Sequence, residues 1–357
     1  MARHEDVKDS SDASVPAAPR LPPVGGWPRA IVLRILALAL AGYAVSNNQD
    51  GLGAIIVLFV LVVPFERLFP RHDHQGFRRP HLELDVGYAL ASPVLQSVGL
   101  VAAVLVGVLS FAWIPGLLLR PYVQSIPEPY LLIVGVMLFD LMGYWTHRFY
   151  HEVPQLWRFH AIHHSPEDMD WASGFRAHPF DGTLIAPAFF FLIAAGFSAE
   201  TSGLIAIAQI LLGLFLHANV RLWLRPLSKI IMTPEFHHWH HSNEEDAIWC
   251  NYSTFLPLWD LIFGTYYMPS DKRPTVYGID EHIPMTMMEQ LQYPLTGIGN
   301  PLRIIRHPWR SFKRMLVTLR GILGMMRRSM FRPRGQPFVR AVAYVQGDDE
   351  SVVDTPP

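Results

Sequence analysis

Histidine is concentrated in one part of this sequence, and its spacing there repeats. Eleven of the seventeen histidines lie between His147 and His241, whereas the other 262 residues contain six. Three stretches, HRFYH, HAIHH and HHWHH, place histidines three or four residues apart, and such residues share one face of an α-helix. His237 is preferred to His238 because it completes this spacing. The eight histidines that follow the pattern are His147, His151, His160, His163, His164, His237, His240 and His241.

This many imidazoles on helix faces predict a metal centre. Without a metal, buried imidazoles need other partners, and protonation would place like charges side by side. Neutral imidazole is a good ligand for iron, zinc, copper and nickel. One zinc takes about three or four protein ligands, so eight or more histidines exceed a single site. Cys250 is the only cysteine, which excludes a Cys-rich zinc or iron–sulfur site. We therefore expect two metal ions bound between helices.

Further polar residues are candidates for the same centre. His217 ends an apolar run and would arrive near the metals, although it could instead cap its helix at the membrane interface. His178, in RAHPFDG, is a candidate ligand that a nearby carboxylate could equally hold. Asp140 lies inside an apolar stretch, where a carboxylate is costly. We expect Asp140 to accept a hydrogen bond from a ligand histidine, the alternative being a contact between helices. Supporting roles are also expected for His238, Asn219, Asn251 and Asp260.

Long apolar segments surround these residues. Half of the chain is hydrophobic and 17% is charged, which favours a membrane-embedded body. A helix needs about 20 residues to cross a bilayer. Only the third segment is long enough unaided, and the fourth becomes so if its helix starts near Glu128. We expect about four spans plus a hairpin. The apolar segments are 31–45, 51–65, 86–113, 130–145, 184–197 and 204–216.

The charges of the connecting segments predict the orientation. Arg20 and Arg29 precede the first apolar segment, and the arginine-rich ERLFPRHDHQGFRRPH follows the second. The opposite loops are SNNQDG, PGLLLRPYVQSIPEP, with Arg120 alone, and SAETSG. Because lysine and arginine concentrate in cytoplasmic loops, we expect the N-terminus and all the histidine stretches on the cytoplasmic face. The net charge of −1 gives no basic field for nucleic acid, which we exclude as a partner.

The composition divides the chain into five regions. Beyond the catalytic region, PWRSFKRMLVTLRGILGMMRRSMF repeats apolar residues every three or four positions among arginines and lysine. This pattern predicts a basic amphipathic helix on the cytoplasmic leaflet, or packed on the cap as an alternative. The expected regions are a disordered leader (1–28), transmembrane helices (29–127), a catalytic domain (128–270), a C-terminal cap with the amphipathic helix (271–334) and a disordered tail (335–357).

The three histidine stretches resemble the boxes of the fatty acid hydroxylase/sterol desaturase superfamily of membrane di-iron oxygenases. The resemblance extends to DLMGYWTHR, RAHPFDG, LHANVR and DAIWCNYSTFLPLWDLIFGTY, and it covers roughly residues 128–268. It implies an all-α integral membrane helical bundle with a cytoplasmic helical cap that carries the boxes. It also implies two non-haem Fe ions bound by the histidines, with O2 as co-substrate.

The function expected from this resemblance is hydroxylation of an aliphatic C–H bond in a membrane lipid, such as a fatty acyl chain or a sterol. Desaturation begins with the same hydrogen abstraction and is the alternative. Electrons would come from a separate donor of ferredoxin, cytochrome b5 or reductase type. A membrane metal transporter or sensor would instead place its ligands along a transmembrane pathway. A haem carrier would need only two axial histidines.

Overall fold

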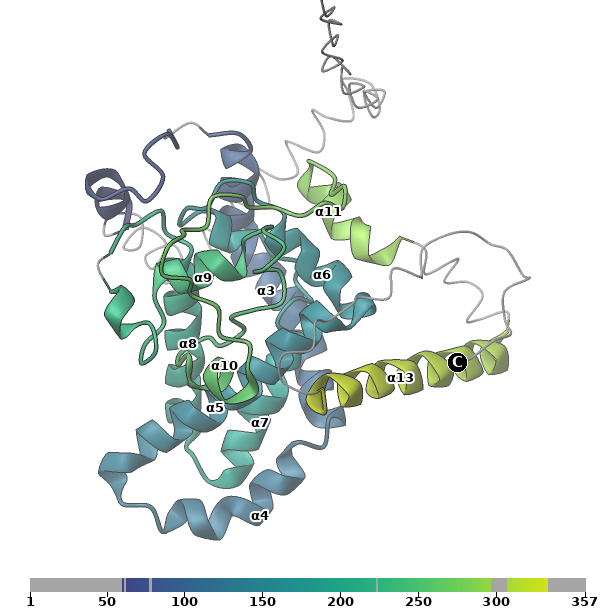
Figure 1. Cartoon of the computed structure of the whole chain (residues 1–357). Coiled ribbons are helices and arrows are strands. Elements are labelled where there is room, and N and C mark those ends of the chain that lie inside the picture. The colour runs from purple at the N-terminus through teal and green to yellow at the C-terminus, as the bar shows by residue number, and fades with distance from the viewer. Residues whose placement is uncertain (1–59, 61, 77–78, 223, 297–306, 333–357) are drawn as a thin grey trace, which may run out of the picture.

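The computed structural model describes residues 60, 62–76, 79–222, 224–296 and 307–332, and it is helical in these ranges (Figure 1). Within them, β-structure is limited to the isolated bridges Pro70–Val220 and Ser242–Tyr277. The all-α prediction is confirmed for this part of the chain. The leader, the tail, the apolar segment 31–45 and most of 51–65 lie outside the described residues.

Three helices are long and apolar enough to cross a membrane. They are α3 (Leu82–Leu109), α5 (Glu128–Glu152) and α8 (Ala199–Leu216). Large apolar side chains on α3 and α8, such as Leu100 and Ile207, are more than half exposed. Apolar surface of this extent is typical of a region that faces lipid. These helices support the prediction of a membrane protein.

Two shorter helices close the bundle at one end. α4 (Trp113–Gln124) packs along α7 (Ala186–Ala195), and Figure 1 shows α4 at the end of the bundle opposite α9. The apolar segment 184–197 therefore contains only a ten-residue helix. Gly196 ends this helix with a φ of 103°, a left-handed conformation that glycine adopts without strain. Ser198 then caps α8 by accepting a hydrogen bond from the Thr201 amide.

Proline sets the turn between the first two histidine stretches. Val153 is extended, as expected for a residue that precedes proline, and Pro154 begins α6 (Pro154–His164) directly after α5 ends. The ends of α5 and α6 carry HRFYH and HAIHH, respectively. The third stretch lies on α9 (Pro234–His240), where the Thr233 side chain accepts from the Phe236 amide and Pro234 occupies the first turn.

Smaller elements complete the part of the molecule around α9. α10 (Leu258–Phe263) packs on α5, and α11 (Met287–Gln292) packs on α3. Single 3-10 turns lie in the segments between α6 and α7 and between α8 and α9, and directly after α11. They are η1 (Ser173–Phe175), η2 (Thr183–Ile185), η3 (Arg225–Leu227) and η4 (Tyr293–Leu295).

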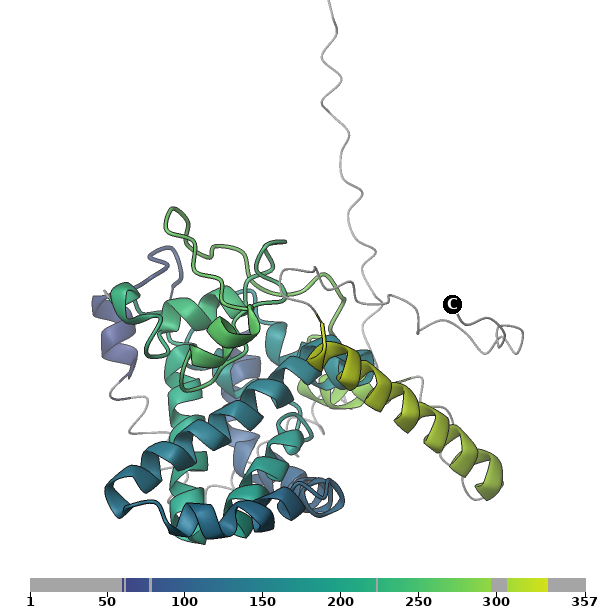
Figure 2. The same ribbon diagram turned by 60° about the horizontal axis from the view of Figure 1, so that its bottom comes forward.

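The expected amphipathic segment forms helix α13 (Pro308–Met330), which extends away from the bundle (Figure 2). Its C-terminal end meets α5 through an ion pair between Arg332 and Glu152. The apolar side chains of Trp309 and Leu323 are exposed, 66% and 56% respectively. Among the described residues this stripe is not packed on the cap, so the alternative of packing there is not what the structure shows.

Close packing of α3 against the segment 179–181 provides a test of the fold. A Cβ atom at Gly99 would overlap the carbonyl oxygen of Pro179, whereas a Cβ at Gly203 on α8 would meet nothing within 4 Å. We expect Gly99→Ala to lower the free energy of unfolding by about 1–3 kcal/mol because backbone must move. Gly203→Ala should cause no loss. Thermal unfolding of both variants in detergent compares them, and equal stability would contradict this packing.

Candidate metal centre

The structure brings nine histidines together in two groups. One group contains His147, His151, His160, His164 and His240, and the other contains His163, His217, His237 and His241. Within each group, the candidate ligand nitrogens all lie within 4.8 Å of one another. Seven of the nine residues are buried, and His147 and His163 are half-buried. The three stretches and the end of α8 therefore meet in one place.

The two groups share the histidine stretches in a regular way. In HAIHH, His160 and His164 belong to the first group and His163 to the second. In HHWHH the assignment is reversed. His240 belongs to the first group, whereas His237 and His241 belong to the second. In both stretches, the first and last of the three histidines, four residues apart, face one group. The histidine between them, three residues after the first, faces the other group. Both α6 and α9 contribute to both groups, which makes the groups adjacent.

In the second group, the Nε2 atoms of His217 and His163 face each other although neither carries the ring hydrogen. His217 Nε2 lies 3.2 Å from His163 Nε2, 3.1 Å from His241 Nε2 and 3.3 Å from His237 Nε2. His217 Nδ1 donates to the Gly213 carbonyl, and His163 Nδ1 donates to the Arg176 carbonyl. A neutral imidazole carries one ring hydrogen, so both Nε2 atoms present lone pairs. Facing lone pairs repel unless a cation lies between them.

Burial keeps these imidazoles neutral. It lowers the pKa of His217 to about 4 and lowers the pKa of His241 well below its ordinary value. Neighbouring imidazoles act in the same direction on His241 because a second positive charge would be repelled. A proton is therefore not the cation that these lone pairs accept near neutral pH. The donor set, buried neutral nitrogen, fits a first-row transition metal.

Removing bound metal should make the protein sensitive to acid. In the unfolded chain a histidine titrates near its ordinary pKa of about 6.5, whereas folded His217 titrates at about 4. Between these values the unfolded state binds more protons, so stability falls as the pH is lowered from about 7 toward about 4. Thermal unfolding of chelator-treated protein at about pH 7 and about pH 5 measures this. An unchanged Tm would contradict it.

Main-chain carbonyl groups orient two histidines of the first group. His147 Nδ1 lies 2.8 Å from the Tyr252 carbonyl oxygen, and His240 Nδ1 lies 2.9 Å from that of Cys250. His240 Nε2 then faces the group with no hydrogen-bond partner among the described residues. Asn251, between the two carbonyls, has a φ of 61° and bonds the carbonyls of Phe236 and Tyr267. This loop therefore fixes which ring nitrogen of each histidine faces the centre.

Asp260 stabilises the same loop through its backbone amides. Its carboxylate accepts the backbone N–H groups of Tyr252 and Ser253 at 2.8 Å each, and also the Thr265 hydroxyl. The supporting roles expected for Asn251 and Asp260 therefore take the form of contacts with main chain. Neither side chain has a recorded hydrogen bond to a histidine ring.

Asp181 is a site residue that the sequence analysis did not assign. Its carboxylate oxygens lie 3.0 and 3.1 Å from His160 Nδ1. Burial alone would raise the pKa of this carboxyl, but His160 and neighbouring imidazoles lower it below its ordinary value. An ionised carboxylate on Nδ1 makes the imidazole a stronger donor to a metal at Nε2. The signal was present in HPFDG, where Asp181 was considered only as a partner for His178.

The segment that contacts His163 is tied to α3. Arg176, whose carbonyl accepts from His163, makes an ion pair with Asp85 near the start of α3. Arg79 bonds the same Asp85 and also Asp170. This buried network includes both signs of charge and several hydrogen bonds, which is the arrangement that compensates the cost of burying charges. It positions the 176 carbonyl and, through it, His163.

The position of Asp140 corrects an expectation. Its carboxylate accepts the backbone N–H groups of Thr254, Phe255 and Leu256 and the Thr254 hydroxyl. The expected hydrogen bond from a ligand histidine is absent from the contacts recorded for Asp140. Asp140 instead anchors the loop two residues beyond Tyr252, so its link to His147 is indirect. The carboxylate inside the apolar helix is compensated by these four donors.

Two other expected supporting residues lie around His217. His238 places Nε2 3.2 Å from the His217 carbonyl oxygen and Nδ1 3.1 Å from the Tyr277 hydroxyl. Asn219 accepts the amides of Arg71 and His72 and donates to the His72 carbonyl. Both residues fix the turn that follows α8. His238 thus stands outside the two groups, as its place in the spacing predicts.

His178 also lies outside both groups. Its Nε2 lies 3.1 Å from the Leu291 carbonyl oxygen, and its Nδ1 accepts the Phe180 amide. Both ring nitrogens therefore have main-chain partners. We remove His178 from the proposed ligand set, because the residue ties the HPFDG turn to α11.

The apolar helices and the two histidine groups are typical of the class of membrane proteins with a site for two metal ions. Comparison with known proteins is more specific. Residues 132–265 match the family model "Fatty acid hydroxylase". The predicted resemblance of this part of the chain to the fatty acid hydroxylase/sterol desaturase superfamily is confirmed.

Several characterised relatives are lipid-modifying enzymes. The chain is 28% identical over 265 residues to ornithine lipid hydroxylase OlsE of Rhizobium tropici, which covers 71% of this chain and 76% of that protein. It is 30% identical to an alkylglycerol monooxygenase of Danio rerio, covering 49% of this chain but only 41% of the relative. A very-long-chain aldehyde decarbonylase of Oryza sativa subsp. indica is 31% identical over 37% of this chain and 22% of its own. No solved structure matches the chain significantly.

Proposed function

We propose that the protein is an O2-dependent di-iron hydroxylase of an aliphatic C–H bond in a membrane lipid. The observation that carries the proposal is the convergence of nine histidines in two adjacent groups whose Nε2 atoms present lone pairs to each other. Imidazole is also a ligand for zinc and copper, so the choice of iron rests on the family. When bound, the two iron ions would supply the redox chemistry.

The stoichiometry of hydroxylation determines which electrons and protons must be supplied. Inserting one oxygen atom from O2 into a C–H bond and reducing the other to water consumes two electrons and two protons. An external electron donor of ferredoxin, cytochrome b5 or reductase type would supply the electrons. The chain itself orients five of the nine candidate ligands at Nδ1, four through main-chain carbonyl groups and one through Asp181. Burial of the ligands limits the access of water to the centre.

The names of the relatives favour hydroxylation over desaturation and over metal transport. Two of them are named a hydroxylase and a monooxygenase, and their substrates are named as an ornithine lipid and alkylglycerols. The first histidine group includes the end of α5, and the second includes His217 at the end of α8, rather than the middle of a span where a transport site would lie. We therefore take ornithine lipids and alkylglycerols as the first substrates to test.

The location that we propose is a multi-pass membrane protein with its metal centre on the cytoplasmic face. The three candidate spans and the arginine-rich segment around Arg67–Arg79 support this orientation. We also propose that α13 lies on the cytoplasmic leaflet. Its exposed apolar stripe beside several arginines is typical of an interfacial helix.

A reconstituted assay tests the proposed function. Purified protein would be loaded with Fe²⁺ and supplied with a reducing system, O2 and a lipid extract that contains both candidate substrates. Mass spectrometry should show the gain of one oxygen atom, and ¹⁸O2 should label the product. Turnover without O2 would contradict the proposal. Loss of two hydrogens without oxygen gain would assign desaturation instead. His240→Ala serves as the inactive control.

A further inference from the structure

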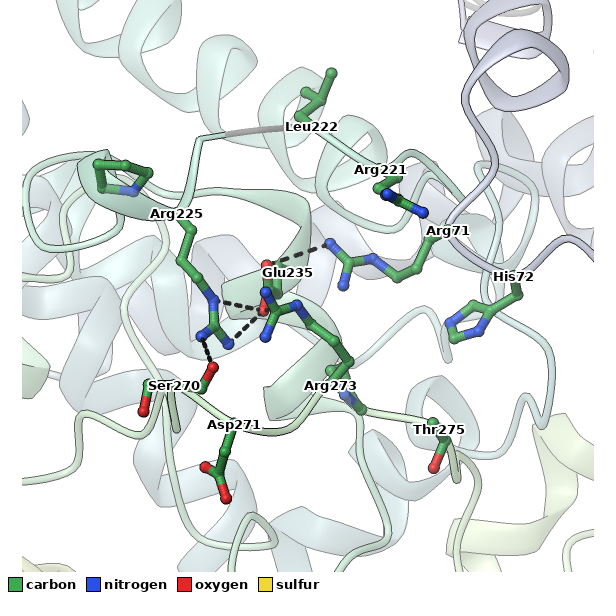
Figure 3. Close-up of a pocket in the computed structure, with 12 residues that line it drawn as sticks. Arg71, His72, Arg221, Leu222, Arg225, Glu235, Ser270, Asp271, Arg273 and Thr275 are labelled. Atoms are coloured by element: carbon green, nitrogen blue, oxygen red, sulfur yellow. Dashed lines mark hydrogen bonds and ion pairs between the residues drawn. The ribbon is translucent and has the colours of Figure 1, made fainter.

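A second polar site includes Glu235 of α9 and contains none of the nine histidines. It is a pocket of about 820 Å³ formed by residues 71–72, 221–222, 225–226 and 270–275, together with Glu235 of α9 (Figure 3). Four arginines line it against two carboxylates. The pocket therefore has an excess of positive charge, which favours an anionic ligand.

Glu235 does not satisfy all of these arginines. Its Oε1 atom is shared by Arg225 at 2.7 Å and Arg273 at 3.1 Å, and Figure 3 shows these side chains reaching toward it. Arg225 also donates to the carbonyls of Pro269, Ser270 and Lys272, so it holds the pocket walls together. Arg225 is thus a structural residue of the pocket, and its donors are already used.

Arg71 is the unusual member of the pocket. Its side chain is only 6% exposed, yet its nearest carboxylate oxygen, Oε2 of Glu235, is 3.8 Å away. This is beyond hydrogen-bond distance, and Arg71 Nε is a buried atom with no hydrogen-bond partner among the described residues. A buried charge without hydrogen bonds is costly, and burial accordingly lowers the pKa of Arg71. An oxyanion in the pocket would supply the acceptors that Arg71 lacks.

The pocket lies where lipid headgroups would be. Arg221 and Arg225 follow the end of α8, a candidate span, and the Arg221 amide bonds the Phe69 carbonyl to join the first two walls. Directly after Arg225, the side chains of Leu227 and Ile230 are 42% and 65% exposed. An arginine pocket beside exposed apolar side chains at the end of a span fits the boundary between headgroups and acyl chains.

We infer that this pocket binds the phosphate of a membrane phospholipid headgroup, with donors from Arg71, Arg221 and Arg273. Arginine is suited to this role because its planar fork donates two parallel hydrogen bonds to phosphate oxygens. The volume leaves space for the glycerol part of a headgroup beyond the phosphate. The inference concerns lipid binding alone, so it stands whether or not the histidine centre is an oxygenase.

Binding to the full-length, delipidated protein in non-ionic detergent tests the inference. Three probes separate the sources of affinity. They are short-chain phosphatidylglycerol, a diacylglycerol with the same chains but no phosphate, and inorganic phosphate. We expect phosphatidylglycerol to bind at least about tenfold more tightly than either other probe. Arg71→Gln and Arg273→Gln should each weaken its binding about tenfold, the value of one charged hydrogen bond.

The matched control is Arg120→Gln, an exposed arginine on α4 at the other end of the bundle, which should change the dissociation constant less than about twofold. Arg221 and Arg273 are exposed, so their variants remain informative if Arg71→Gln fails to fold. Equal binding of diacylglycerol, equal binding of inorganic phosphate, or an equal effect of Arg120→Gln would each overturn the inference. Metal content, measured on the same samples, should be unchanged.

Discussion

His163→Ala is expected to lower the metal content from about two ions per chain to about one and to reduce lipid hydroxylation more than about hundredfold. The variant removes one of four nitrogens in the second group and leaves three. The loss should exceed the 10–100-fold effect typical of residues that only support a ligand. Metal analysis of the purified variant and the lipid assay together measure it.

His178→Ala is the matched control for this prediction. Both histidines are candidates by sequence, but His178 contacts main chain at both ring nitrogens and lies outside the two groups. We expect His178→Ala to keep its full metal content, with any defect confined to stability, because its link to α11 is lost. A folded His178→Ala protein that lost metal as His163→Ala does would refute the proposed ligand set.

Asp181→Asn should weaken metal binding by about 10–100-fold while the protein still folds. The carboxylate holds Nδ1 of His160 and stabilises positive charge that develops on the imidazole when it binds a cation. Asparagine keeps an acceptor of similar shape but removes the charge. Titration of the metal-free protein with Fe²⁺ under anaerobic conditions measures the change in affinity.

The control for Asp181→Asn is Asp246→Asn, which removes an exposed carboxylate that pairs with Lys272 at the surface. An exposed pair of this kind contributes little, so metal affinity should not change. If Asp181→Asn bound metal as tightly as the wild type, the carboxylate would be a structural group of the HPFDG turn and not a partner that tunes His160.

Much of the centre could be predicted from spacing because the periodicity of a helix is local. The intervals of three and four residues place His160, His163 and His164 on one face, and the structure has them on one face of α6. Spacing could not predict that His163 faces one group and its neighbours the other. That division depends on how α6, α9 and the end of α8 pack together, and no local pattern encodes it.

The supporting contacts were harder to predict for a different reason. The carbonyl groups of Tyr252, Cys250 and Arg176 orient three histidines. Every residue has a main-chain carbonyl, so the residue type does not predict which one will bind a histidine. Asp140 was predicted to matter because a carboxylate in an apolar helix needs a partner, which it has. The partner proved to be the 254–256 backbone instead of an imidazole, since the loop after Tyr252 packs against α5.

The apolar segments show a similar limit. Hydropathy predicted that α3 and α5 are long enough to cross a membrane, and they are. The segment 184–197 is equally apolar, but Gly196 ends α7 after ten residues and α4 packs along it. Composition reports how apolar a segment is, whereas its length as a helix depends on where a residue such as Gly196 turns the chain.

The metal stoichiometry of the wild-type protein tests the central claim most directly. Protein loaded anaerobically with Fe²⁺, freed of excess ion and analysed by inductively coupled plasma mass spectrometry should contain about two irons per chain, one for each histidine group. Retention of about one iron, or of none, by folded protein would contradict a bimetallic centre built from these nine histidines.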